Sequence, residues 1–216
     1  MNELVQTELK KIFNGRFSTS ESTRANYARG EDTYEPVLSQ AVVFPETNEE
    51  VSKILKLCNE SKIPVVPFGT GTSLEGNAVG NSNGITISLE KMNKVLSVNA
   101  EDFDCRVQAN VTRKQLNEYL REDGVFFPID PGADAAIGGM ASTSASGTMA
   151  VKYGTMRTVI SGLTVVLANG EIIKIHQTVG FNPEYTSHNS LLTELENSSL
   201  SAIRNQVTEI HFYGAG

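Results

Sequence analysis

The stretch "AVVFPETNEEVSKILKLCNESKIPVVPFGTGTSLEGN", residues 41–77, decides the fold class of the first part of the chain. A short β-branched run ends at Pro45, and Thr47 with Glu50 has the Thr-x-x-Glu spacing of a capping box, which predicts the start of a helix. Apolar residues then recur at helical spacing as far as Cys58, and a second β-branched run follows. Strand, helix and strand in this order predict a βαβ-like unit, from which a glycine-rich loop emerges.

The glycine-rich loop has the composition of a phosphate-binding loop but fits neither of two common motifs. A P-loop requires a Lys-Ser/Thr pair after its last glycine, whereas Asn77 and Ala78 follow Gly76. A Rossmann fingerprint requires glycine where Leu74 stands. Two interpretations remain: a tight strand connection without a ligand, or a nest in which main-chain N–H groups and nearby hydroxyls hold an anion.

The remainder of the chain predicts mostly antiparallel strands. Alternating patterns predict strands at 84–90, 93–99 and 104–111, and a second capping box, Thr112 with Gln115, predicts a helix over 113–123. In 161–175 two alternating runs flank Asn169-Gly170, a strong hairpin signal. We therefore expect an α+β fold, with a further helix possible at 191–207 and a strand at 207–213.

A second glycine-rich stretch, "DPGADAAIGGMASTSASG" at 130–147, also follows an extended run. Its small residues would let the main chain approach a flat or extended ligand closely, but they equally suit a tightly packed helix. Two such stretches in one domain fit a large ligand with a diphosphate.

Composition and charge limit the classes of function. The net charge is −7 and no Lys/Arg cluster interrupts it, so we expect no nucleic-acid partner. Cys58 and Cys105 have no zinc spacing and lie in apolar patterns, so we expect buried thiols and no metal site.

The first 17 residues predict an amphipathic helix and not a signal peptide. Its apolar side would consist of Leu4, Val5, Leu9, Ile12 and Phe13. No apolar run approaches the ~20 residues that a membrane span needs. We expect a cytoplasmic protein, with a peripheral position at the inner membrane as an alternative.

Four stretches resemble the FAD-binding domain of the vanillyl-alcohol-oxidase-type (PCMH-type) flavoproteins: "PFGTGTSLEGN", "NAEDFDCRVQANVTRKQLNEYL", "FFPIDPGADAAIGGMASTSASGTMAVKYGTMR" and "GLTVVLANGEII". They are most similar to the branch with D-lactate dehydrogenase (cytochrome) and the glycolate oxidase flavin subunit. The resemblance implies a two-subdomain α+β domain over 31–176, comprising a βαβ-type lobe and a lobe with a mixed or antiparallel sheet and helices. Residues 1–30 would be a helical lead-in, and 177–216 would be a tail unlike the family.

The resemblance also implies that FAD lies extended between the subdomains. Residues of the first glycine-rich loop would wrap its diphosphate, and those of the second would flank the diphosphate, the ribityl chain and the ring. The implied cofactor-binding residues are Pro67, Phe68, Gly69, Thr70, Gly71, Thr72, Ser73, Leu74, Pro131, Gly132, Gly138, Gly139, Ala141, Ser144, Ser146, Gly147, Tyr153 and Gly154.

The implied activity is oxidation of a D-2-hydroxy acid such as D-lactate or glycolate, with a cytochrome or quinone as electron acceptor. Three alternatives stay open. The chain could be an FAD-holding module that needs a partner chain, it could be a truncated or joined gene product, or it could be a relative of the NADPH-dependent cell-wall UDP-sugar reductase. Asp134, Lys152 and Arg157 lie near the second stretch, but we expect structural roles for them and assign no catalytic residue.

The tail differs from the family. Relatives continue with another glycine-rich turn over the flavin and then a substrate domain with metal-binding histidines, and 177–216 match neither. We expect His188 and His211 to be ordinary surface or core residues. Because no histidine precedes His176, neither glycine-rich stretch offers a histidyl flavin link, and we expect non-covalent FAD.

Overall fold

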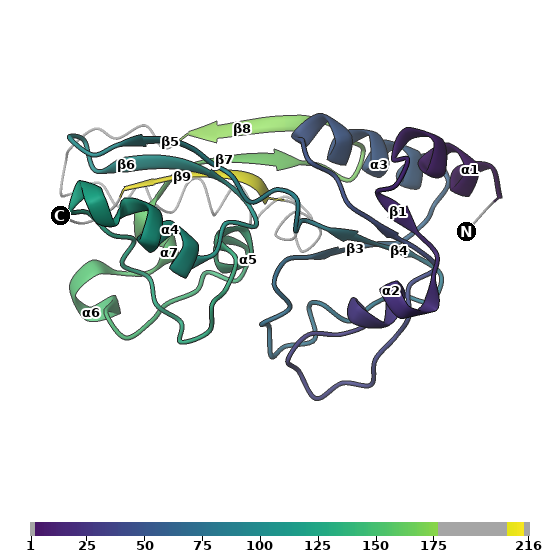
Figure 1. Cartoon of the computed structure of the whole chain (residues 1–216), viewed down its shortest axis with the longest axis horizontal. Coiled ribbons are helices and arrows are strands. Elements are labelled where there is room, and N and C mark those ends of the chain that lie inside the picture. The colour runs from purple at the N-terminus through teal and green to yellow at the C-terminus, as the bar shows by residue number, and fades with distance from the viewer. Residues whose placement is uncertain (1–2, 177–206, 214–216) are drawn as a thin grey trace. The chain divides into compact units, whose positions relative to one another are not determined.

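The structure is a computed structural model of the 216-residue chain, and it describes residues 3–176 and 207–213 (Figure 1). The chain forms two compact units. Unit 1 comprises Met1–Asn93 and Val166–Ile172, and unit 2 comprises Lys94–Val165 and Ile173–Gly216. Each unit combines helices with a β-sheet, so the predicted α+β class is confirmed.

Unit 1 contains the predicted βαβ-like arrangement with one difference. Its sheet has the order β1-β2-β4-β3, in which β2 and β3 are both parallel to β4 and β1 is antiparallel to β2. The two strands on either side of the helix are therefore separated by β4. The elements are α1 (Glu3–Ile12), β1 (Phe17–Ser18), α2 (Glu21–Asn26), β2 (Val42–Val43), α3 (Asn48–Glu60), β3 (Val65–Phe68) and β4 (Ile85–Ser88).

The core of unit 1 takes buried apolar side chains from α1, α3 and the sheet. Every residue of β4 is buried, as are Val51, Ile54, Leu55 and Cys58 of α3. For α1, the prediction of which residues form the apolar side is partly wrong. Val5, Leu9 and Phe13 are buried, since they repeat every four residues, whereas Leu4 and Ile12 are exposed.

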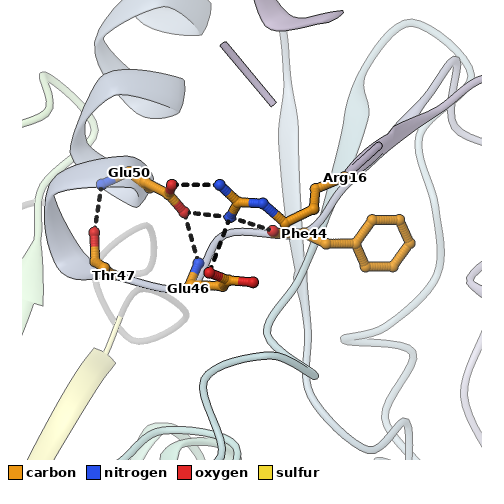
Figure 2. A network of polar contacts seen from close by, with 5 residues as sticks. All are labelled: Arg16, Phe44, Glu46, Thr47 and Glu50. Atoms are coloured by element: carbon orange, nitrogen blue, oxygen red, sulfur yellow. Dashed lines mark hydrogen bonds and ion pairs between the residues drawn. The ribbon is translucent and has the colours of Figure 1, made fainter. Parts of the chain in front are cut away.

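Figure 2 shows how the N-terminus of α3 is fixed. The Thr47 hydroxyl accepts a hydrogen bond from the Glu50 amide, as the capping box predicts. The second hydrogen bond of a capping box, from the Thr47 amide to the Glu50 carboxylate, is not formed. It accepts the Glu46 amide at 2.7 Å and two guanidinium N–H groups of Arg16 at 2.6 Å each. Arg16 also donates to the Phe44 carbonyl. The segment before β1 is thereby bound to the start of α3.

Unit 2 has a sheet of order β5-β6-β9-β7-β8, in which β9 is antiparallel to both β6 and β7. In Figure 1, α4 and α5 lie on one side of this sheet. The elements are β5 (Val95–Asn99), β6 (Asp104–Gln108), α4 (Arg113–Leu120), the 3-10 turn η1 (Arg121–Asp123), α5 (Ile137–Ser142), α6 (Ala150–Tyr153), α7 (Met156–Val159), β7 (Ile160–Val166), β8 (Ile172–His176) and β9 (Val207–Tyr213).

Several predicted local signals of this part are confirmed. The capping box of Thr112 and Gln115 starts α4, as predicted. After η1, Gly124 lies in the left-handed region at φ +70°. The hairpin is present, but only Gly170 has a positive φ, and its amide donates to the Leu167 carbonyl. The predicted strand at 207–213 is β9. The possible helix at 191–207 and His188 lie outside the described residues, apart from Val207.

Candidate functional site

The first glycine-rich loop, here called the first cradle (residues 67–74), leaves the carboxyl end of β3. Pro67 and Phe68 are the last residues of β3, and 69–74 are irregular. Gly71 has φ +74°, which glycine adopts without strain. A Cβ at Gly71 would lie 2.8 Å from the buried Phe68 ring. The ring of Phe68 therefore supports the loop and leaves no space for a side chain at Gly71.

Main-chain and hydroxyl groups supply the donors of the first cradle. Among the described residues, the amides of Gly69, Gly71, Thr72, Ser73 and Leu74 have no hydrogen-bond acceptor. The Thr70 and Thr72 hydroxyls lie 3.4 Å apart, and the Ser73 hydroxyl accepts the Asn77 side-chain amide at 3.1 Å. An ionised diphosphate only accepts hydrogen bonds, so this donor set fits its chemistry without a lysine or arginine.

A segment that the sequence analysis did not include in the site packs against the first cradle. Residues 28–37, the wall segment, contact the first cradle at Gly71 and the loop just after it at Gly76. The Glu31 amide donates to the Gly71 carbonyl at 2.8 Å, and a Cβ on Gly30 would overlap that same carbonyl oxygen. A Cβ on Gly76 would lie 2.8 Å from the Tyr34 ring. Gly30 stands out as the glycine of "ARGEDTYEP", residues 28–36, but no local pattern in the sequence reveals its contact with Gly71.

The second glycine-rich stretch, here called the second cradle (130–147), begins with a tight turn in unit 2. Gly132 has φ +90°, and its amide donates to the Asp130 carboxylate at 3.0 Å. That carboxylate is paired with Arg113 at 3.5 Å. A Cβ on Gly147 would overlap the carbonyl oxygen of Asp130, so the two ends of the stretch pack directly on one another.

The small residues of the second cradle have two interpretations, a tightly packed helix and close approach of the main chain to a ligand. Gly138 fits the first of these, and Gly139 fits the second. Gly138 is buried in α5, its amide donates to the Ala109 carbonyl at 2.7 Å, and an added Cβ would lie 2.7 Å from the Ala109 Cβ. This glycine therefore serves helix packing. At Gly139 an added Cβ meets nothing within 4 Å, and the residue is exposed.

The remaining predicted residues of the second cradle lie on its surface or just beyond it. Ser144 is exposed with φ +52°, Ser146 is exposed, and Pro131 and Ala141 lie in the turn and in α5. The ring of Tyr153, at the end of α6, packs edge-on against Phe126 with 5.6 Å between centroids.

Three further contacts have structural roles. Gly154 has φ +80°, and an added Cβ would overlap the Thr158 hydroxyl. The Lys152 ammonium lies 4.8 Å from the Tyr153 ring centroid. Asp134 accepts the Lys114 amide in the first turn of α4, which agrees with the structural role expected for it.

The comparisons with known proteins agree with this geometry. Residues 39–176 match the FAD binding domain family. The chain belongs to this family. The predicted resemblance and the predicted cofactor, FAD, are thus confirmed at the level of the family.

Curated relatives include D-lactate dehydrogenases and a glycolate oxidase subunit. The chain is 49 % identical over 156 residues to "Probable D-lactate dehydrogenase, mitochondrial" of Danio rerio, which is 72 % of this chain and 31 % of the relative. It is 42 % identical over 170 residues to "D-lactate dehydrogenase [cytochrome], mitochondrial" of Arabidopsis thaliana, 78 % of this chain and 30 % of the relative. It is 32 % identical over 160 residues to "Glycolate oxidase subunit GlcD" of Bacillus subtilis, 73 % of this chain and 34 % of the relative.

The chain therefore spans about a third of the length of these relatives. A solved structure of alkyldihydroxyacetonephosphate synthase has the same fold, with a TM-score of 0.81 at 20 % identity, covering 100 % of this chain and 41 % of that one. Several relatives are named as mitochondrial. In the part of the chain that the structure describes, no helix combines the length and apolar character needed to cross a membrane.

Proposed function

We propose that the two cradles hold FAD and that the chain is the FAD-binding part of an oxidoreductase acting on a D-2-hydroxy acid, D-lactate or glycolate. The observation that carries this proposal is that the amides of Gly69 and of 71–74 have no acceptor among the residues that the structure describes, in a chain that belongs to the FAD binding domain family. The names of its D-lactate dehydrogenase and glycolate oxidase relatives support the substrate class. When bound, FAD supplies the redox chemistry by accepting a hydride and releasing electrons.

The residues of the chain bind and orient the cofactor in this proposal. The amides of Gly69 and of 71–74 in the first cradle donate to the diphosphate, because an anion held by several N–H groups needs no cationic side chain. Gly132 and Gly139 of the second cradle leave the main chain open to close approach by the cofactor. The domain limits proposed from the sequence, 31–176 with a distinct tail at 177–216, belong to this proposal, although the wall segment extends the cofactor-binding part back to residue 28.

The names of the relatives support part of the proposal about the electron acceptor and the location of the protein. Relatives named "D-lactate dehydrogenase [cytochrome]" support a cytochrome as acceptor, with a quinone as the second possibility. We propose a location in the mitochondrion or the bacterial cytoplasm, with peripheral membrane contact as the alternative.

Substitution of Gly71 tests the first cradle. Gly71→Ala forces an L residue to φ +74° with its Cβ 2.8 Å from the Phe68 ring, so we expect FAD to bind about tenfold more weakly. Gly124→Ala is the matched control, since Gly124 has φ +70° with nothing within 4 Å of its Cβ position. It should lose about 1 kcal/mol of stability and keep its FAD affinity. FAD affinity is measured by titrating the flavin-free chain and following flavin fluorescence.

Two results would contradict the proposal at this step. If the wild-type chain binds no FAD, the proposed function is wrong. If Gly71→Ala binds FAD as tightly as Gly124→Ala does, the first cradle does not hold the diphosphate.

Addition of D-lactate separates the enzyme from the binding module. We assign no catalytic residue in these 216 positions, and we expect the FAD-loaded chain to keep its visible absorbance when D-lactate is added without oxygen. Anaerobic absorbance at the flavin band is the measurement, with dithionite as the positive control for bleaching. Bleaching by D-lactate would show that this chain by itself carries the substrate groups.

A further inference from the structure

The orientation of one peptide group links the wall segment to the donors of the first cradle. The Gly71 carbonyl accepts the Glu31 amide at 2.8 Å and therefore points toward the wall segment. In a trans peptide the C=O and the following N–H point in opposite directions. The amide of Thr72 consequently points away from Gly30 and Glu31, and it has no acceptor among the described residues.

Asp32 holds the wall segment in the conformation that orients the peptide group between Gly71 and Thr72. Its carboxyl group is buried, with the residue 6 % exposed, and each oxygen accepts one main-chain amide. Oδ2 accepts from Gly30 at 3.1 Å and Oδ1 from Tyr34 at 3.0 Å. These two amides belong to the residues that pack on Gly71 and on Gly76. A single side chain thus fixes both contacts of the wall segment with the loop.

We propose that Asp32 is a positioning residue of the cofactor site, which fixes the wall segment so that the Thr72 amide is aimed at the FAD diphosphate. This inference rests on the proposed function and extends it to a residue that precedes the matched family region, 39–176. Asp32 acts through Gly30, Glu31 and Gly71, and it does not contact the cofactor.

The experiment compares three variants of the whole chain. Asp32→Leu removes both acceptors and should weaken FAD binding about tenfold or more, whereas Asp32→Asn keeps one oxygen and should recover part of that loss. Asn81→Leu is the matched control. The Asn81 side chain accepts a hydrogen bond from the Asn83 amide at 2.9 Å in a turn of the same unit, and Asn81 belongs to neither the first cradle nor the wall segment. It should lower thermal stability and leave FAD affinity within about twofold.

A second measurement does not depend on the cofactor. In flavin-free protein with ¹⁵N-labelled glycine, the amide signals of Gly30 and Gly71 should shift in both Asp32 variants and stay in place in Asn81→Leu, with Gly71→Ala identifying one signal by its loss. If Asp32→Leu does not fold, Asp32→Asn carries both measurements.

Two outcomes would overturn the inference. One is an Asp32→Asn chain whose Gly71 signal is unchanged, and the other is an Asp32 variant whose FAD affinity equals that of Asn81→Leu at equal stability. A wild-type chain that fails to bind FAD would instead contradict the proposed function, while the glycine signals would still report whether Asp32 positions the loop.

Discussion

Glu50 is bonded by two separate parts of unit 1, Arg16 before β1 and the Glu46 amide before α3 (Figure 2). The hydrogen bond from Arg16 is the largest cause that holds the pKa of Glu50 below its usual value, and it exceeds the opposing effect of partial burial. A carboxyl whose pKa is lower in the folded state stabilises the fold above its ordinary pKa. The stabilisation is lost as the pH falls through the lower pKa of the folded state.

Glu50→Gln should therefore destabilise the chain at neutral pH but not in acid. We expect a loss of about 1–2 kcal/mol at pH 7, because charge-assisted hydrogen bonds from Arg16 and Glu46 are weakened. Below the ordinary carboxyl pKa, about 4.3, the difference from wild type should shrink. Urea unfolding at pH 7 and at successively lower pH values measures both effects.

The control is Glu118→Gln. Glu118 pairs with Arg121 at 3.1 Å, but both side chains are about 70 % exposed, at 70 % and 72 %. Its replacement should change stability by less than about 0.5 kcal/mol at any pH. A loss equal to that of Glu50→Gln would show that the Arg16 contact adds nothing.

At the scale of residues, the sequence predicts local partners and misses distant ones. The spacing of Thr47 and Glu50 correctly places the start of α3, but Arg16 takes the carboxylate, and nothing in the spacing indicates a partner 34 residues away. The same holds for Gly30 and Gly71. Each glycine is visible in the sequence, whereas their contact depends on tertiary packing.

At the scale of elements, β9 is the central strand of the sheet in unit 2. It pairs with β6 on one side and with β7 on the other, and Ile210 lies opposite both Val107 and Leu163. The sequence predicts a strand at 207–213, but not its position in the sheet, because pairing partners so far apart in the chain leave no local signal. For the same reason the sequence did not place β4 between β2 and β3.

Proline in β9 should be far more harmful than proline at the sheet edge. Ile210→Pro removes an N–H from a strand paired on both sides, so we expect a loss of roughly 3 kcal/mol. Leu96→Pro is the control, since Leu96 lies in the edge strand β5 at the irregularity between Val95 and Ser97. Thermal unfolding followed by circular dichroism compares the two. Equal losses would argue against a central position of β9.

At the scale of the whole molecule, the structure supports the prediction of non-covalent FAD. Burial raises the pKa of Cys58 to about 12, and burial with the nearby Asp104 raises the pKa of Cys105 to about 12. Neither thiol is a nucleophile near neutral pH, since the thiolate is the reactive form. We therefore expect acid precipitation of the FAD-loaded chain to leave the flavin in the supernatant. A yellow pellet after washing would demonstrate a covalent link.

The sequence predicts those features of the molecule that depend on residues close together in the chain. Strand alternation, capping residues and glycine-rich loops are local, and they predicted the α+β class and most element positions. The family resemblance added FAD, which the loops by themselves left open. The wall segment and the order of strands required the structure, because they result from contacts between distant residues.

The place of β9 also has a consequence for synthesis of the protein. The ribosome completes β6 at Gln108 and β7 at Val166, yet the strand that lies between them is made from residues 207–213. Until β9 emerges, the edges of β6 and β7 that it covers are unpaired, and such edges are templates for pairing with other chains. We expect newly made molecules to depend on chaperones during this interval.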